Sequence, residues 1–557
     1  MLLGAAFLFA TVAVAIPASS PFPYNSQPYA RHSRRAAANE SSLEVDLGYA
    51  IYRGSYNNET QLNEFKGFEH QTNCSEETGC PVLVWIHNGG YGQGAGGNDL
   101  APLITTNDNG FIGVGMNYRL GAFGFLSSDE VHRRGVANAG LLDQQLALHW
   151  VQQYIHLFGG DASRVTIFGE SAGAGSVMLH DIAYGGTLGM SLFRNSITAS
   201  PYLVFQYDYN GWQPSQAYYA LAAAAGCDTM NAYLNNAPFR NNNSMQIFDC
   251  LQQADSATLM EASAQVSQSG SWSTFAFLPV TDGVFIQERP SKALMEGKVN
   301  GLNHVAGANA LEGAAWVPPI IDTAKDLVHY LEDTFPMFSN NDIATLLYYY
   351  KTDNASTDPD APLWATAGDY GPTTLNQSSA YTGQQQRAVA IYGETTFICP
   401  SYWLAEAYSD NVYTGGKGWK YQFSIPPAWH GNDGGAYFQY PDRVTYYSAD
   451  SVYAFEKMIG NVVLHDHPSM SSEIVNGIAL GNDTYNPASE WPQYTMYDPQ
   501  MMDFNTTCPQ TINRGGLEYC VGPNEINTFR LVDGFGWEGG RGLRCDFWKL
   551  MGELVPE

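Results

Sequence analysis

The stretch Gly169-Glu170-Ser171-Ala172-Gly173 constrains the fold more than any other, because of what precedes and follows it. The apolar and β-branched run Val165-Thr-Ile-Phe168 predicts a strand, and the small residues Ala172–Gly175 predict the start of a helix. A strand that enters a helix through so tight a turn strains the serine backbone and lifts its hydroxyl above the sheet. Glycine on both sides of the serine fits a place where two backbones come too close for side chains. The pattern favours a nucleophilic Ser171; the alternative is a glycine-rich helix start with a capping serine.

Composition and charge limit the class of protein. The 557 residues are 45% hydrophobic and 13% aromatic, which is typical of a globular chain with a sizeable core. The formal net charge of −28 argues against nucleic acid and anionic membranes as partners, since both would repel an acidic surface. Beyond the N-terminus no stretch approaches the roughly 18 uninterrupted apolar residues of a membrane span. A transmembrane segment is therefore not expected. No Cys-x-x-Cys occurs, and the two histidines His465 and His467 are too few to indicate a metal site, so no bound metal is expected either.

The N-terminus predicts secretion. Residues 1–19 have an apolar core that ends in small residues at Ala13 and Ala15, as a signal peptide does, although a basic start is missing and an uncleaved anchor is the alternative. Residues 20–42 are expected to form a flexible leader. Its Arg34-Arg35 pair is either a processing site or part of a plain solvated linker. We expect a single domain over residues 43–557.

Sequons and cysteines agree with an extracellular location. Eight Asn-x-Ser/Thr sequons predict a glycoprotein, at Asn39, Asn58, Asn73, Asn242, Asn354, Asn376, Asn482 and Asn505. The eight cysteines form an even set that an oxidising compartment would allow to pair fully. Their spacing makes Cys227–Cys250 and Cys508–Cys520 plausible disulfides and brings Cys74 near Cys80, which leaves Cys399 and Cys545 for each other.

Strand-like and helical segments alternate from about residue 81, which predicts a mainly parallel sheet with helices on both faces. Four further strands are expected at residues 81–87, 110–118, 303–309 and 419–425, and a helix at residues 141–157. The interval 205–300 is rich in helix and poor in strand pattern, as expected of a helical insertion over the sheet.

A serine hydroxyl needs a base to remove its proton, and the base needs an acid to hold it. In doubly wound hydrolases these partners follow the serine in the order Asp/Glu, then His. Glu312 comes just after an expected strand and before a glycine, which favours it as the acid over a surface glutamate in a turn. Among the later histidines, His430 lies on a rigid loop after a strand and two prolines, so we assign it as the base. His329 has helical spacing, and we expect it to be a packed helix residue.

The oxyanion of a tetrahedral intermediate needs preorganised backbone N–H donors. The turn His87-Asn-Gly-Gly-Tyr91 ends an expected central strand, so we assign Gly89 and Gly90 as donors, together with Ala172 after the nucleophile. The segment Gly92–Gly97 also matches the Gly-x-Gly-x-x-Gly pattern of dinucleotide sites, but Asn98, Asp99 and Pro102 stand where a helix would have to begin. No cofactor is therefore expected.

These residues carry a family resemblance. The chain resembles the type-B carboxylesterases and lipases, the α/β-hydrolase family that includes the cholinesterases. The match rests on Asn117–Leu126, Asn138–Gln144, Phe158–Val177 and the segments around Glu312 and His430, and it runs from about residue 43 to the C-terminus. The resemblance implies an α/β-hydrolase fold and hydrolysis of small-molecule or lipid esters through an acyl-enzyme on Ser171, without a cofactor. It also implies Glu312 as the acid, where many other α/β-hydrolases use Asp.

The chain departs from the family in two places. Asn88 stands after His87 where the family usually has Gly, which implies a modest change of loop shape. Residues 69–80 alone connect the N-terminal hairpin to the oxyanion strand, where similar proteins have a much longer span with a Pro-Pro-Gly turn, a cysteine loop and a strand. We expect this shortening to remove an edge strand or a rim of the active-site gorge, with an exposed sheet edge as the consequence.

Two other functions are compatible with the same fold. Non-catalytic binding or adhesion proteins usually lose the serine or the histidine, whereas Ser171, Glu312 and His430 are all present here. A related lipase, peptidase or acyltransferase would use the same acid and base, so only its substrates would distinguish it.

Overall fold

The central sheet is built on short apolar strands that are buried on both faces. The structure is a computed structural model, and it describes residues 43–65, 68–70, 74, 78–227, 243–270, 272, 274–350, 383–409, 415–438, 447–480, 484–507, 509–514, 517–521 and 525–555. The proposed signal segment, the leader and Cys508 lie outside these residues. Residues Ser42–Glu557 belong to one compact unit.

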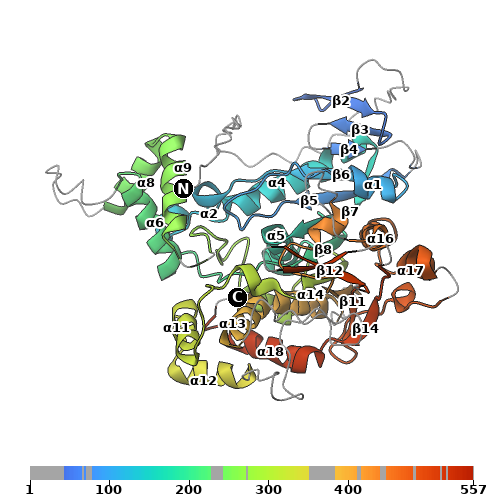
Figure 1. Ribbon diagram of the computed structural model, residues 1–557. Coiled ribbons are helices and arrows are strands. Elements are labelled where there is room, and N and C mark those ends of the chain that lie inside the picture. Colours follow the sequence, from blue (N-terminus) through green and yellow to red (C-terminus); the bar gives the residue numbers. More distant parts are fainter. Residues whose placement is uncertain are drawn as a thin grey trace. The chain divides into compact units, whose positions relative to one another are not determined.

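In the described part of the chain, 12 strands form one sheet in the order β1-β2-β3-β4-β6-β5-β7-β8-β9-β10-β11-β14 (Figure 1). Every pairing from β6 to β11 is parallel, and the pairings at both ends of the sheet are antiparallel. The strands are β1 (Leu43–Asp46), β2 (Ile51–Asn57), β3 (Leu62–Phe65), β4 (Phe68–His70), β5 (Cys80–Ile86), β6 (Ile112–Met116), β7 (Gly160–Glu170), β8 (Asn195–Ala199), β9 (Asn303–Asn309), β10 (Lys417–Phe423), β11 (Gln500–Phe504) and β14 (Arg530–Asp533). A separate hairpin pairs β12 (Gln510–Arg514) with β13 (Leu517–Val521).

The helices supply the outer layers and the insertion. They are α1 (Ala101–Thr106), α2 (Gly121–Phe125), α3 (Asp129–Arg134), α4 (Ala139–Tyr154), α5 (Ala172–Ile182), α6 (Trp212–Ala224), α8 (Asn243–Gln253), α9 (Ser256–Gln268), α10 (Pro290–Met295), α11 (Ala324–Thr334), α12 (Asn340–Tyr349), α13 (Gly383–Gly393), α14 (Cys399–Ser409), α15 (Gly434–Tyr437), α16 (Ala449–His465), α17 (Ser472–Leu480) and α18 (Trp537–Met551). The expected helical insertion is confirmed, since α6, α8 and α9 (green in Figure 1) pack together and against α2 and α3.

Strand β5 shows how the two faces of the sheet are buried. Val84 and Ile86 point into one apolar cluster, which includes α4 and α5, whereas Leu83 and Trp85 point into the other, which includes α1 and α16. Successive side chains of a strand face opposite sides, so a strand buried on both faces must be apolar almost throughout. The expectation of an α/β-hydrolase fold with helices on both sides of a mostly parallel sheet is confirmed.

The shortened connection does not leave β6 as a bare edge. The three-residue strand β4 pairs antiparallel with β6, with Phe68 opposite Val114 and Glu69 opposite Gly113. Strands β3, β2 and β1 continue the sheet outward from β4. The expectation of an exposed edge at this point was wrong, because β4 pairs with β6 through Phe68 and Glu69.

Three disulfides lie within the described residues, and all three match the expected pairs: Cys74–Cys80, Cys227–Cys250 and Cys399–Cys545. The first closes the short connection before β5, the second ties the end of α6 to α8, and the third joins α14 to α18. The pair that involves Cys508 stays a prediction. None of the helices in the described ranges is long and apolar enough to cross a bilayer.

Candidate active site

The turn between β7 and α5 holds Ser171 in a strained conformation. Its φ is 56° and its ψ is −123°, outside the regions that non-glycine residues prefer. The glycines on either side allow the strand and the helix to approach. A Cβ on Gly169 would come within 2.3 Å of the Gly173 carbonyl carbon, and one on Gly173 within 2.0 Å of the Ile86 carbonyl oxygen. The sequence-based prediction of a strand–turn–helix elbow is therefore correct in its backbone detail.

The structure brings Ser171, His430 and Glu312 together. Nε2 of His430 lies 2.8 Å from Oγ of Ser171, and Nδ1 lies 2.5 Å from Oε2 of Glu312. His430 follows β10 in a loop with a cis Pro426–Pro427 bond, and Glu312 opens a short 3-10 turn after β9. One imidazole thus bridges a serine hydroxyl and a buried carboxylate, which is the geometry that proton transfer from a serine requires.

The second oxygen of Glu312 is also held. Oε1 accepts hydrogen bonds from Oγ of Ser200, at 2.5 Å, and from the backbone N–H of Asn309, at 2.6 Å. The Asn309 side chain donates to Ser200 and also to Asp433, which lies in the His430 loop. Asn309 and Ser200 therefore connect the segments that carry the acid and the base.

Three carboxylates surround His430. Burial acts to lower the pKa of His430, but the charges of Glu312, Glu170 and Asp433 outweigh it and raise that pKa above 6.5. Burial, followed by the charge of Glu170, raises the pKa of Asp433 to about 7. Burial also raises the pKa of Glu170. The site therefore stabilises the protonated imidazole of His430 relative to a histidine side chain in water.

The turn after β5 holds the two glycines that we expected to donate to an oxyanion. Gly89 and Gly90 have φ of 109° and 63°, and a Cβ on Gly89 would lie 2.1 Å from the carbonyl oxygen of Gln93. Within the described part of the chain, the N–H groups of Gly89, Gly90 and Ala172 donate to no other protein group. Next to this turn lies the ring of Phe275, which a Cβ on Gly90 would meet at 2.6 Å.

Aromatic rings pack on the base. Phe397 lies 4.2 Å and Trp316 5.5 Å from the His430 ring, measured between centroids. Phe397 belongs to a π-helical segment, Glu394–Ile398, between α13 and α14, and such segments are frequent at functional sites. Tyr202 stacks on Phe397 and is buried.

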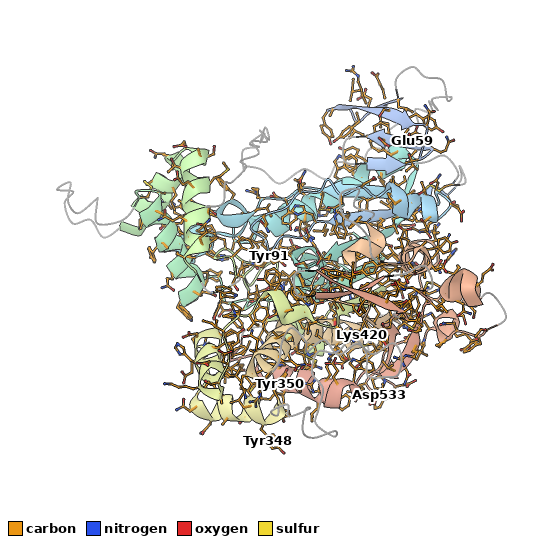
Figure 2. The ribbon with its side chains drawn as sticks, in the orientation of Figure 1. Glu59, Tyr91, Tyr348, Tyr350, Lys420 and Asp533 are labelled. Carbon is orange, nitrogen blue, oxygen red and sulfur yellow. A yellow bond between two sulfur atoms is a disulfide. The ribbon has the colours of Figure 1, made fainter. Side chains whose placement is uncertain are left out.

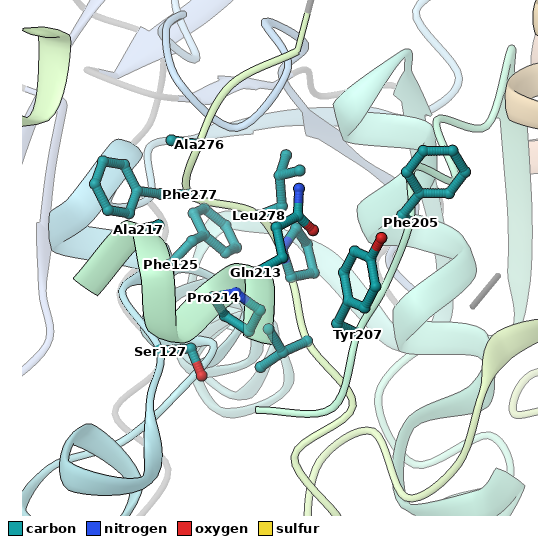
Figure 3. Close-up of a pocket in the computed structure, with 12 residues that line it drawn as sticks. Phe125, Ser127, Phe205, Tyr207, Gln213, Pro214, Ala217, Ala276, Phe277 and Leu278 are labelled. Atoms are coloured by element: carbon teal, nitrogen blue, oxygen red, sulfur yellow. The ribbon is translucent and has the colours of Figure 1, made fainter. Parts of the chain in front are cut away.

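A small pocket lies between α2, α6 and residues 276–280, and none of Ser171, Glu312 and His430 lines it. Figure 3 shows the rings of Phe125 and Phe277 on one side of it and those of Phe205 and Tyr207 on the other. Its remaining lining is Ser127, Gln213, Pro214, Ala217, Ala276, Leu278, Pro279 and Val280. The segment with Phe205 begins at Tyr202, whose backbone N–H donates to the Ser171 carbonyl at 3.2 Å.

A second serine–histidine contact occurs in the core. Oγ of Ser196 lies 2.7 Å from Nδ1 of His304, and that nitrogen lies 3.3 Å from Oδ2 of Asp181. Ser196 on β8, His304 on β9 and Asp181 on α5 are all fully buried, so no substrate reaches them. This cluster belongs to the core and is no second active site.

The three other histidines that follow Glu312 do not join the Ser171–His430 contact. His329 is on α11 as the spacing predicted, but its side chain is 74% exposed and faces Glu332 and Asp333, so the expectation of a packed residue was wrong. His465 and His467 stack on each other. Among the described residues, no three His, Cys, Asp or Glu side chains are placed to hold a metal ion.

Sequence reasoning did not find several residues of the site: Ser200, Asn309 and Phe397, which contact Glu312 or His430, and Phe275, which lies against the Gly90 turn. Ser200 and Asn309 both lie at the C-terminal ends of parallel strands, where polar residues often serve a site, and this position could have identified them. Phe275 and Phe397 had no distinguishing signal, because their roles depend on where distant segments pack.

Comparisons with known proteins agree with this geometry. The sequence profile of the carboxylesterase family matches residues 62–517. Carboxylesterase patB of Aspergillus clavatus is 32% identical over 365 residues, which are 64% of this chain and 58% of that protein. Lipase 4 of Diutina rugosa is 31% identical over 359 residues, or 62% of this chain and 58% of the lipase. The alignments thus span less than two thirds of the length of these relatives.

Two further relatives extend the comparison. Secreted lipase 1 of Botryotinia fuckeliana is 30% identical over 428 residues, or 74% of this chain and 68% of that lipase. The crystal structure of Aspergillus niger EstA matches with a TM-score of 0.67 at 21% identity, and covers 93% of this chain and 99% of its own, which shows the shared fold. The profile match over most of the chain means that this protein belongs to the carboxylesterase family.

Proposed function

We propose that this protein hydrolyses carboxylic esters through an acyl-enzyme on Ser171. The observation that carries the proposal is the position of His430, which contacts Ser171 on one side and Glu312 on the other. The carboxylesterases and lipases among its relatives support the same reaction class.

The roles of the residues follow from their atoms. Nε2 of His430 takes the proton of Ser171 as Oγ attacks the ester carbonyl carbon, and the developing imidazolium is stabilised by Glu312. The N–H groups of Gly89, Gly90 and Ala172 are the proposed donors to the oxyanion. His430 then protonates the departing alcohol, and a water molecule releases the acid from Ser171 in a second step of the same kind.

The aromatic rings beside the site suggest the kind of ester. Phe397 and Trp316 pack on His430 and Phe275 lies against the Gly90 turn, so an uncharged acyl or alcohol group would be favoured there over an ionic one. The strongly acidic chain, with a net charge of −28, would disfavour anionic substrates further. We propose small-molecule or lipid esters with an apolar part as substrates.

A covalent label tests the nucleophile. A fluorescent organophosphonate should label the wild-type protein and fail to label Ser171→Ala. Ser196→Ala is the matched control, because Ser196 also contacts a histidine but is fully buried, and its labelling should equal that of the wild type. A binding or adhesion protein on this fold would leave the wild type unlabelled, and that result would refute the proposal.

We further propose that the protein is secreted, with residues 1–19 as signal peptide, 20–42 as leader and 43–557 as the catalytic domain. The three disulfides and the secreted lipases among its relatives support an extracellular location.

N-glycans provide a test of secretion that depends on burial. Asn58 is exposed at the turn between β2 and β3, beside Glu59 (Figure 2), whereas the side chain of Asn505 is fully buried. Mass spectrometry of the protein collected from the medium of a eukaryotic host should find a glycan on Asn58 and none on Asn505. Asn58→Gln should lower the apparent mass by one glycan. An unmodified Asn58, or a glycan on Asn505, would contradict the expectation.

A further inference from the structure

One carboxylate oxygen next to the Ser171–His430 hydrogen bond accepts no hydrogen bond of its own. Oε1 of Glu170 lies 3.6 Å from Nε2 of His430, the nitrogen that contacts Ser171. Glu170 is 4% exposed, and among the residues that the structure describes its Oε1 accepts no hydrogen bond. A buried carboxylate oxygen without a donor is unfavourable. This oxygen is therefore suited to a donor that enters the site during the reaction.

Asn88 fixes the opposite oxygen of the same carboxylate. Its Nδ2 donates to Oε2 of Glu170 at 2.5 Å. The space beside Oε1 is kept free by Gly431, because a Cβ there would lie 3.4 Å from that oxygen and the φ of +76° disfavours any side chain. Asn88 thus orients the carboxylate from one side, and Gly431 places no side chain beside its other oxygen.

We propose that Glu170, oriented by Asn88, binds the water that hydrolyses the acyl-enzyme, and so favours water over alcohols as the acyl acceptor. This inference rests on the acyl-enzyme proposed above. Water has two O–H groups and can donate one to Nε2 of His430 and the other to Oε1 of Glu170. An alcohol has only one O–H group, and His430 requires it. Oε1 of Glu170 would then have no donor, and the alkyl group of the alcohol would lie against the charged carboxylate.

The step balances without any further reactant. The water oxygen forms a bond to the acyl carbon while His430 takes one of its protons. The bond from that carbon to Oγ of Ser171 then breaks, His430 returns the proton to Oγ, and the carboxylic acid leaves. Glu170 accepts a hydrogen bond throughout and takes no proton. Glu170 is therefore a catalytic residue of the second step, and Asn88 is a positioning residue.

The ratio of two products tests the proposal. The full-length protein is given p-nitrophenyl butyrate in a fixed concentration of methanol, and methyl butyrate and butyric acid are measured by gas chromatography. The ratio of methyl ester to acid depends only on how the acyl-enzyme is resolved, so it is insensitive to folding yield and to the rate of the first step. For Glu170→Gln we expect it to rise about tenfold, because the amide oxygen keeps the bond from Asn88 and the amide NH₂ replaces the acceptor that faces the water.

Two further variants separate the role of Asn88 from that of charge. Asn88→Asp keeps the shape but replaces the donor with a second carboxylate, and we expect it to raise the ratio about threefold or more. Asp433→Asn is the matched control, since Asp433 is also buried, its charge also acts on His430, and it too has one oxygen held by an asparagine and one without a donor. Among the described residues it forms no ion pair with His430, whereas Oε1 of Glu170 lies 3.6 Å from Nε2. Its ratio should equal that of the wild type.

Two results would overturn the inference. An unchanged ratio in Glu170→Gln would mean that Glu170 does not bind the attacking water, and an equal rise in Asp433→Asn would mean that charge alone sets the ratio. Both leave the covalent label on Ser171 intact. Failure of the proposed function would instead appear as a wild-type protein that takes no label.

Discussion

His430→Ala is expected to lower kcat for ester hydrolysis by a factor of about 10⁴ or more, because Ser171 loses the only base that contacts its hydroxyl among the described residues. The comparison is made with a chromogenic short-chain ester at saturating concentration. KM should change little, since the imidazole removes a proton and does not bind the acyl chain.

The pH dependence of the wild type supplies a second measurement for the same residue. Only the neutral imidazole can accept the serine proton, so kcat/KM should rise with pH as His430 loses its own proton. Because the surrounding carboxylates raise the pKa of His430 above 6.5, the midpoint of this rise should lie above pH 6.5.

Far-ultraviolet circular dichroism of His430→Ala should match the wild type. A folded variant that keeps its turnover within about tenfold would refute the proposed triad.

Glu394→Ala is expected to destabilise the fold by about 3–5 kcal/mol, because it leaves two buried arginines without their shared carboxylate. Oε1 of Glu394 contacts Arg544 at 2.6 Å and Arg541 at 3.4 Å, and Oε2 accepts from Arg544 at 2.7 Å. All three side chains are at most 2% exposed. Burial alone acts to raise the pKa of Glu394, but the two guanidinium groups outweigh it and hold that pKa below its usual value.

The measurement is the free energy of unfolding from urea titration, with disulfides intact. Arg133→Ala is the control, since Arg133 pairs with Asp129 across an exposed turn of α3 and its loss should change stability by about 0.5 kcal/mol or less. A loss below about 1 kcal/mol in Glu394→Ala would contradict the expectation. It would mean that the cluster around Arg541 and Arg544 reorganises to pair these charges elsewhere, for example through Glu538.

Some strands could not be predicted because their polar side chains are satisfied across the sheet. Strand β8 contains Asn195, Ser196 and Thr198, a composition that suggests a loop, yet it lies in the centre of the sheet. Ser196 and Thr198 both hydrogen-bond to His304 on β9, so burial costs them little. Strand β11 was not predicted for the same reason, since it contains the buried Asp503, whose partner Arg530 comes from β14. Such partners are distant in the sequence, so a local pattern does not indicate them.

The edge of the sheet shows a similar limit. From the sequence, the short connection before β5 suggested a missing strand, because residues 69–80 alone stand where similar proteins have a much longer span. The structure fills the place with β4, whose pairing to β6 involves only Phe68 and Glu69. Backbone hydrogen bonds carry that pairing, and they are available to almost any sequence that the chain brings close enough.

The sequence by itself determined the elbow, and it predicted the order of the proposed acid and base and the turn proposed to hold the oxyanion donors. These features are local, since a nucleophile between two close backbones needs glycines within a few positions, and loops after strands converge on one edge of a parallel sheet. The tertiary structure alone decided what surrounds them. His430 meets Glu312 and Ser171 across 118 and 259 residues of chain, and Asn88 meets Glu170 across 82. Contacts of that range follow from how the strands are ordered and packed, so whether a particular carboxylate faces the base or the solvent is decided only when the sheet is assembled.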